Sequence, residues 1–454
     1  MSKTIFLRTR VLLILAALLA SPLTAEQPKL TLQQAVASAL EHNPVRKLAA
    51  AEMASANAGF QLSKAPLFPQ LQFSENLTRG DDPVYAFGTK LRQQVFQTSD
   101  FGLGSLNRPS PLSDFNTTFS GRWVAFDSLH TQFQIKRASL MKQGAAASAG
   151  RTGQEVIYRV VEAYESVLIA TREVEVARHA VETAQTLYRE SRTRVDAGLA
   201  VESDALSAQV HLAARQQELI QSQGAEQTAW SELEAAVGVA LPQGPEGLEQ
   251  LAEHSFSTSA LADEVEQAFK TRSDLKSLVL QTSAQQAAVR SVKSEFGPRV
   301  DAFGSWQTDR QNFAGSGGSN WMAGAELRVD LLPMEKRSRL QQEKASLLRA
   351  QAGEDAARSI IRVEVSRAYF AHQSASKMVE VARASMTQAA ESVRILRNRY
   401  DAGLAPLTDV LRAEDAERQS LSGYWQAIYH NALSYAALRL ATGTLNAEQV
   451  VNFQ

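Results

Sequence analysis

The fold is decided by one short stretch, Arg397-Asn398-Arg399-Tyr400-Asp401-Ala402-Gly403-Leu404-Ala405-Pro406-Leu407-Thr408-Asp409-Val410-Leu411. An apolar-periodic helical pattern leads into this stretch and breaks at Asp401-Ala402-Gly403. Pro406 then opens a second helix, because proline is tolerated in the first turn and glycine ends helices. The stretch predicts the sharp tip of a long helical hairpin.

The chain contains a second copy of this tip. Arg192-Thr193-Arg194-Val195-Asp196-Ala197-Gly198-Leu199-Ala200 lies 205 residues earlier and leads to Ser203-Asp204-Ala205-Leu206. When residues 158–238 are aligned without gaps to the segment 205 positions later, about three in ten are identical. Further upstream the offset becomes 229, as Pro69 and Pro298 show. We interpret the pattern as an internal duplication with a longer loop in the first half.

The duplication suggests how the chain is divided. We predict a signal peptide at 1–25, a first repeat at 26–240 with its tip near 196–204, a linker at 241–260, a second repeat at 261–443 with its tip near 401–409, and a C-terminal tail at 444–454.

Composition narrows the functional classes. The 454 residues include 47 basic and 48 acidic side chains, so no nucleic-acid partner is indicated. Cysteine is absent, which excludes disulfides and thiolate metal sites. Lys3, Arg8 and Arg10 precede an apolar run that ends before Ala25, which is typical of a secretory signal; a buried N-terminal helix is the alternative. No later apolar run approaches the roughly 20 residues of a membrane helix. We therefore expect an exported protein.

Most of the chain shows helical periodicity and four short segments alternate like strands. Helices are expected at 30–62 with a break at Asn43-Pro44, at 129–195, 201–237 and 261–294, and on both sides of the second tip; strands are expected near 71–74, 119–126, 300–307 and 321–330, and a long loop at 80–116. A continuous helix over 129–195 measures about 100 Å, which requires a bundle or coiled coil.

Four strands cannot close a barrel, and unpaired strand edges are not tolerated in lipid. If the strands enter a membrane, two copies give eight strands and a filled interior, whereas three give twelve and a lumen. The alternation over Trp321 to Asp330, and the tryptophans Trp123, Trp306 and Trp321 as interfacial aromatics, favour the membrane. A four-stranded sheet with one face in water is the alternative; export and the long helices favour the barrel.

These features resemble the TolC family of outer-membrane factors, which serve tripartite efflux pumps and type I secretion systems. The similarity covers nearly the whole mature chain: the duplication, Phe68-Pro69-Gln70-Leu71 and Gly297-Pro298-Arg299-Val300 before each hairpin, and the two tips with Ser203-Asp204 and Thr408-Asp409.

The resemblance implies a mainly α fold with a small β part. Its long helical hairpins would form an α-barrel, and four strands per chain would contribute to a twelve-stranded trimeric transmembrane β-barrel. It also implies the outer membrane of a Gram-negative bacterium as location, with the helices extending into the periplasm. The implied partners are a homotrimer, a periplasmic adaptor (membrane fusion protein), an inner-membrane transporter of RND, ABC or MFS type, and outer-membrane lipid.

The resemblance also assigns roles to tip residues. Glycine and the next apolar residue meet the adaptor in such proteins, which corresponds to Gly198, Leu199, Gly403 and Leu404; helix capping by glycine is their structural role in either case. An aperture gate is implied at Tyr400, Asp204, Asp409 and Arg412. Two positions differ from the family pattern. Where the family has an arginine after the second tip glycine, this chain has Ala405, and where the family has a further carboxylate at the aperture, this chain has Arg412. Either Arg412 supplies a substitute cation, or Tyr400 donates to Asp204. First-turn carboxylates favoured by the helix dipole are the alternative for Asp204 and Asp409.

Catalysis is not indicated. The seven histidines are dispersed without metal-ligand spacing, and no phosphate loop or nucleophile elbow appears. We expect no enzyme, no cofactor and no metal, but a passive exit duct opened by an adaptor and driven by a transporter. The alternative is a periplasmic coiled-coil scaffold or tether without a pore.

Overall fold

The computed structural model describes residues 29–242 and 244–448. The predicted signal peptide at 1–25 therefore lies outside the described residues, as do the last residues of the predicted tail. None of the described helices has both the length and the apolar composition that crossing a membrane requires.

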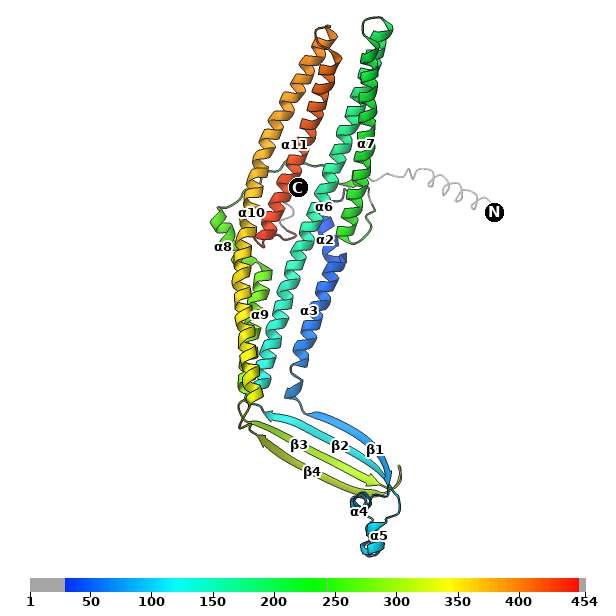
Figure 1. Ribbon diagram of the computed structural model, residues 1–454, viewed down its shortest axis with the longest axis vertical. Helices are drawn as coiled ribbons and strands as arrows, with labels where there is room; N and C mark the ends of the chain where they lie inside the picture. The colour runs from blue at the N-terminus through cyan, green and yellow to red at the C-terminus, as the bar shows by residue number, and fades with distance from the viewer. Residues whose placement is uncertain (1–28, 243, 449–454) are drawn as a thin grey trace, which may run out of the picture. The chain divides into compact units, whose positions relative to one another are not determined.

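The described chain folds into two compact units, and both repeats contribute to each (Figure 1). The first unit contains residues 29–47, 153–268 and 363–448, and the second contains 48–152 and 269–362. The helices are α2 (Leu32–His42), α3 (Pro44–Leu62), α4 (Pro83–Arg92), α5 (Leu103–Asn107), α6 (His130–Asp196), α7 (Glu202–Val237), α8 (Leu261–Thr271), α9 (Ser273–Ser294), α10 (Met334–Asp401) and α11 (Leu407–Ala441), with three short 3₁₀ turns at Ala65–Leu67, Thr98–Phe101 and Pro245–Gly247.

The core of the first unit lies among α2, α6, α7 and α11. Val160 and Tyr164 of α6, Leu233 of α7 and Leu438 of α11 are almost completely buried. The Tyr164 hydroxyl donates to the Leu30 carbonyl at 2.8 Å, which satisfies the one polar atom of this ring within the core. Small and branched side chains make up most of this core, and the rings of Phe256 and Tyr435 stack beside it.

The predicted linker packs on this core. Leu248 and Leu251 are buried, and Leu248 forms a parallel bridge with Leu30. Leu445, in the predicted tail, is also buried. The predicted helix at 261–294 is two helices, α8 and α9, which are separated at Arg272.

The second unit carries one four-stranded antiparallel sheet of order β1-β2-β3-β4. Its strands are β1 (Gln70–Gly80), β2 (Leu112–Phe126), β3 (Arg299–Arg310) and β4 (Gly317–Arg328). The register gives the sheet two unlike faces. One face, here called the apolar face, carries Leu71, Phe73, Phe119, Trp306, Trp321, Ala323 and Leu327, and the other, the polar face, carries Gln72, Asn76, Asp114, Asn116, Asp301, Asp309, Asn320 and Glu326.

The prediction of a long loop at 80–116 is wrong. Strand β1 continues to Gly80, and strand β2 already begins at Leu112. The residues between the two strands form α4, a 3₁₀ turn and α5. Asp82 caps α4 by accepting from the Tyr85 amide at 2.8 Å, with Pro83 in the first turn. The high content of glycine and proline indicated a loop, but the segment is folded by contacts within itself and with the sheet.

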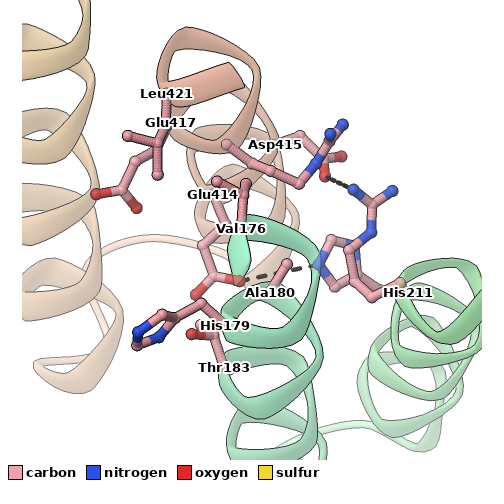
Figure 2. A pocket seen from close by; sticks show the side chains of 11 residues that line it. Val176, His179, Ala180, Thr183, His211, Glu414, Asp415, Glu417 and Leu421 are labelled. Carbon is pink, nitrogen blue, oxygen red and sulfur yellow. Dashed lines mark ion pairs between the residues drawn. The ribbon is translucent and has the colours of Figure 1, made fainter. Parts of the chain in front are cut away.

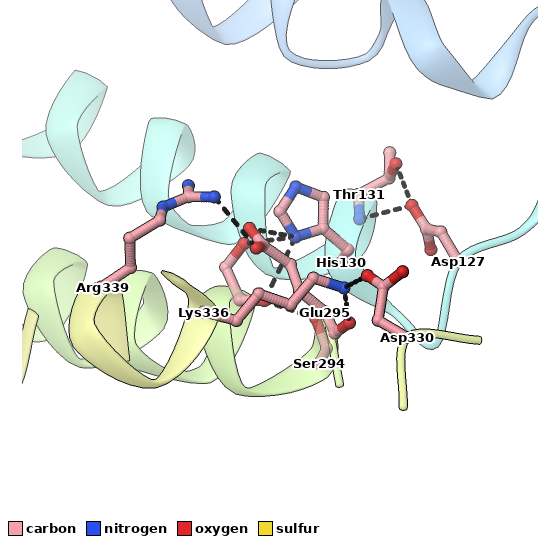
Figure 3. A network of polar contacts seen from close by, with 9 residues as sticks. Asp127, His130, Thr131, Ser294, Glu295, Asp330, Lys336 and Arg339 are labelled. Carbon is pink, nitrogen blue, oxygen red and sulfur yellow. Dashed lines mark hydrogen bonds and ion pairs between the residues drawn. The ribbon is translucent and has the colours of Figure 1, made fainter. Parts of the chain in front are cut away.

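A network of polar contacts connects the ends of the sheet strands with the adjoining ends of α6, α9 and α10 (Figure 3). Glu295, at the end of α9, accepts from Arg339 of α10 at 3.1 Å and lies 3.6 Å from Nδ1 of His130. Lys336 pairs with Asp330 at 2.5 Å. Asp127 accepts from the Thr131 amide at 2.8 Å and so caps α6. Each helix start is thereby tied to the base of the sheet.

Candidate functional site

The two hairpin tips have the same backbone geometry. Gly198 and Gly403 have φ of +71° and +72°, a left-handed conformation that glycine adopts without strain. The amides of Leu199 and Leu404 donate back to the carbonyls of Arg194 and Arg399, at 2.8 and 2.7 Å. This is the Schellman arrangement, which ends α6 and α10 and turns the chain sharply.

Leu199 and Leu404 project from the tips into solvent. Their side chains are 80 % and 69 % exposed, so neither leucine contributes to the core. A methyl group added at either tip glycine would meet no atom within 4 Å. Glycine is thus required at Gly198 and Gly403 by conformation and not by space, and the tips are free to contact another molecule.

One arginine joins the two tips of the chain. The guanidinium carbon of Arg194 lies 4.5 Å from the centroid of the Tyr400 ring. Its Nη1 donates to the Tyr400 carbonyl at 3.3 Å, and its Nη2 to Oδ1 of Asp401 at 2.9 Å. We call Arg194, Tyr400 and Asp401 the tip clamp. It combines a cation–π contact with an ion pair across two hairpins.

The clamp rests on a small apolar cluster. Tyr400 is 6 % exposed and packs with Leu187, Ala208, Leu407 and Val410. Burial raises the pKa of the Tyr400 hydroxyl; the Arg194 charge lowers it, and the Asp204 charge raises it further. Within the described residues this hydroxyl has no hydrogen-bond partner. The bond from Tyr400 to Asp204, one of the two alternatives from the sequence, is therefore not formed within one chain.

The other predicted gate residues are Asp204, Asp409 and Arg412, and they are not members of the tip clamp. Asp204 and Asp409 are half-buried in the first turns of α7 and α11, where their carboxylates face the positive end of the helix dipole. Arg412 is exposed, and no ion pair to it is formed among the described residues. Within one chain, Arg194 supplies a cation at the tips. A contact of Arg412 with another chain stays a prediction. The signal in the sequence was the arginine in the last turn of α6, one residue before the position that the duplication aligns with Tyr400.

A second polar group lies further from the tips, between α7 and α11. Arg418 donates to Glu218 at 2.6 Å, Arg215 lies 3.4 Å from Asp415, and His211 lies 3.9 Å from Glu414. We call these six residues the polar layer. All of them except Glu218 border a cavity of about 290 Å³, and Figure 2 shows His211 turned toward Glu414.

Glu414 is the unusual member of the polar layer. Its side chain is 7 % exposed, and burial raises its pKa to about 7. Burial also lowers the pKa of His211. The charged form of each group is disfavoured, so the pair is sensitive to pH in the neutral range. Sequence analysis missed this pair, although Glu414 occupies a buried position on the helical stripe that follows Val410.

Four aromatic residues, one from each strand, form a row across the sheet. Phe73, Phe119, Trp306 and Trp321 lie side by side on the apolar face. The ring centroids of Phe73 and Phe119 are 5.1 Å apart, and those of Phe119 and Trp306 are 5.9 Å apart. All four side chains are 43 % exposed or more. Trp123, on the same face, donates its Nε1 hydrogen to the Leu67 carbonyl at 3.1 Å. This aromatic row is apolar surface that water would not stabilise.

Within the described residues, no group of three or more histidine, aspartate or glutamate side chains is arranged to hold a metal ion. The histidines serve in packing and ion pairs instead. His372, for example, is 4 % exposed and its Nδ1 lies 3.2 Å from the Ser434 hydroxyl.

Duplicated helical hairpins, joined to a sheet that is apolar on one face and polar on the other, define a class of outer-membrane channel protein. The chain belongs to the outer membrane efflux protein family, whose model matches residues 35–239 and 265–444. It is therefore an exit duct of the outer membrane that extends into the periplasm, and its fold is mainly α with four strands. Its relatives are channel proteins and not enzymes.

Two curated proteins and one solved structure illustrate the relationship. Protein CyaE of Bordetella pertussis is 25 % identical over 396 residues, which cover 85 % of this chain and 78 % of CyaE. The alkaline protease secretion protein AprF of Pseudomonas aeruginosa is 22 % identical over 90 % of this chain and 83 % of its own. The CmeC outer membrane channel of Campylobacter jejuni has the same fold, with a TM-score of 0.76, 16 % identity, and coverage of 92 % of this chain and 88 % of CmeC.

Proposed function

We propose that three copies of this chain form one closed duct, with a twelve-stranded barrel in the outer membrane and the helical hairpins in the periplasm. The main support for this proposal is that the four-stranded sheet of one chain is open. β1 and β4 are its edges and run antiparallel to each other. Consequently β4 of one subunit can pair with β1 of the next in the same antiparallel pattern, and the ring closes without an edge.

The two faces support a barrel with a water-filled interior. The apolar face carries the aromatic row, as expected for a belt at a membrane interface. The polar face carries aspartates and asparagines, which suit a lumen. Eight strands leave an interior filled by side chains, whereas twelve leave a channel, so three subunits fit a duct better than two.

The tips act as the gate of this duct. The tip clamp holds the two hairpins of a subunit together, and Asp204, Asp409 and Arg412 are the groups left to face neighbouring subunits. A periplasmic adaptor that contacts Gly198, Leu199, Gly403 and Leu404 opens the gate if it binds the dilated arrangement more tightly than the closed one. An inner-membrane transporter supplies the energy, because the chain has no nucleotide-binding loop.

The name of one curated relative favours a protein as cargo. AprF is, by its name, a protein that serves alkaline protease secretion, and it aligns with 90 % of this chain. A secretion duct would work with an ABC-type transporter rather than an RND or MFS pump. Deleting the gene and comparing the secreted proteins with the efflux of dyes separates the two cargo classes.

The assembly is tested by native mass spectrometry in mild detergent together with depth-dependent quenching of tryptophan fluorescence. We expect a mass of three subunits. In single-tryptophan variants in brominated lipid vesicles, Trp306 and Trp321 should be quenched strongly, whereas Trp230, which is 8 % exposed within the helical core, should not. A single-subunit mass, or equal quenching of Trp230 and Trp321, contradicts the proposal and favours a tether without a pore.

A further inference from the structure

The segment that joins β1 to β2, residues 81–111, is folded on itself. Phe87, Phe96 and Phe101 stack edge to face, with centroid separations of 4.9 and 5.2 Å. Lys90 pairs with Asp100 at 2.7 Å. A connection between antiparallel strands needs only two to five residues. This segment, here called the β1–β2 loop, is therefore a small structural element and not only a connection.

The β1–β2 loop is attached to the polar face of the sheet. Gln93 is 2 % exposed, and its Nε2 donates to the Ser113 carbonyl and to Oδ1 of Asp114, both at 2.9 Å. The Asn320 side chain donates to the Arg92 carbonyl at 3.4 Å. The register places Asp114 and Asn320 on the polar face. The loop thus crosses from β2 to β4 over the side that becomes the lumen.

The attachment is close. At Gly318 of β4 an added Cβ atom would lie 2.0 Å from the Arg92 carbonyl oxygen, which no real contact allows. The loop lies at the end of the sheet opposite to the end where β2 and β4 lead into α6 and α10 (Figure 1). In the outer membrane this end faces the cell exterior, because the helices extend into the periplasm.

Simple geometry shows what three such loops would do. Twelve strands about 4.8 Å apart, tilted by about 40°, enclose a ring about 24 Å across, measured between backbones. A helix with its side chains is about 10 Å wide, and three of them packed together fit a circle of about 22 Å. Three copies of α4 on the lumen side therefore occupy most of the mouth.

We propose that the β1–β2 loops of three subunits converge at the outer mouth and form a second barrier, which limits the size of what leaves the duct. The loop carries exposed apolar side chains that suit contact among the three copies, namely Val84, Leu91, Phe101 and Leu103. Apolar constrictions restrict passage by excluding water. The inference rests on the proposed trimer.

Because the loops and the tips are barriers in series, the test removes both. Single-channel conductance is measured in planar bilayers for Arg194→Ala, and for Arg194→Ala combined with replacement of residues 83–109 by a short Gly-Ser turn. We expect the single-channel conductance of the combined variant to be at least about twice that of Arg194→Ala, because the cross-section at the mouth widens. Gln93→Ala, which removes the buried attachment, should give a smaller rise in the same background. Asn107→Ala, an exposed amide in the same loop, should give none.

The outcomes separate this inference from the proposed function. If the loop-replaced protein is a trimer with the conductance of Arg194→Ala alone, the inference is wrong while the duct stands. If the loop-replaced protein fails to assemble, Gln93→Ala against Asn107→Ala decides, and equal conductance of those two rejects the inference. If the unmodified protein forms neither trimer nor channel, the proposed function fails and the second barrier fails with it.

Discussion

The guanidinium group of Arg194 lies over the ring of Tyr400, with 4.5 Å between its central carbon and the ring centroid. Arg194 belongs to the last turn of α6 and Tyr400 to the last turn of α10. One contact thus joins the two hairpin tips of a single subunit. Any dilation that separates the hairpins must break it, together with the ion pair from Arg194 to Asp401.

Replacing Arg194 by alanine should raise the open probability of the channel. A partly exposed cation–π contact and a partly exposed ion pair contribute about 1–2 kcal/mol together, which corresponds to a five- to thirtyfold shift in the gating equilibrium. Single-channel recording measures the shift. Arg192→Ala is the matched control, since the ion pairs of Arg192 among the described residues, with Asp196 and Glu202, stay within its own hairpin. Equal effects of the two variants would mean that the clamp does not gate.

The role of the Tyr400 hydroxyl is separated from that of its ring by two substitutions. Tyr400→Leu removes the ring that Arg194 contacts and should raise conductance. Tyr400→Phe should stay close to wild type, because the hydroxyl has no partner within the described residues of the subunit. A rise for Tyr400→Phe that is matched by Asp204→Ala would show instead that the hydroxyl donates to Asp204 of a neighbouring subunit.

The polar layer predicts a dependence on pH. The pKa of Glu414 is raised to about 7 in the packed arrangement, so this arrangement binds the proton more tightly than the separated one does. The stabilisation is therefore present at low pH and is lost as the pH rises through about 7. His211, whose pKa is lowered, opposes this trend at acid pH. Glu414→Gln should gain stability relative to wild type between pH 5 and 7.5, by at most about 3 kcal/mol.

Thermal unfolding of the helical circular dichroism signal, recorded across this pH range in mild detergent, measures the difference. Glu417→Gln is the control, because Glu417 lines the same cavity but is only half-buried. A constant difference between Glu414→Gln and wild type over the range would contradict the assignment.

The tip leucines predict a loss of adaptor binding without a loss of fold. Leu199→Asp combined with Leu404→Asp introduces charge at side chains that are 80 % and 69 % exposed, so the cost in stability should stay within about 0.5 kcal/mol. Cross-linking to the adaptor in cells should fall sharply, while the trimer mass is unchanged. Val210→Asp, at a residue of similar exposure further along α7, should retain the cross-link. Undiminished cross-linking in the tip variant would place the docking surface elsewhere.

Local chemistry alone determined the long helices of the two hairpins and their tips. Glycine after a helix and proline before the next act within one turn, so Gly198, Gly403 and Pro406 define the hairpins from sequence. The duplication is likewise a property of the sequence. The strand alternation gave the two faces of the sheet, because side chains alternate regardless of which strand pairs with which.

Only the tertiary structure decided which side chains meet. The duplication aligns Arg194 with Arg399, yet Arg194 alone reaches across to the other tip. The partners of Gln93 and His211 lie 21 and about 200 residues away, and no local rule relates such positions. The same holds for the attachment of residues 81–111 to the sheet, because Gln93 and Arg92 contact residues of β2 and β4. Local propensities act through neighbours in the chain, whereas a contact such as the tip clamp exists only after two hairpins have come together.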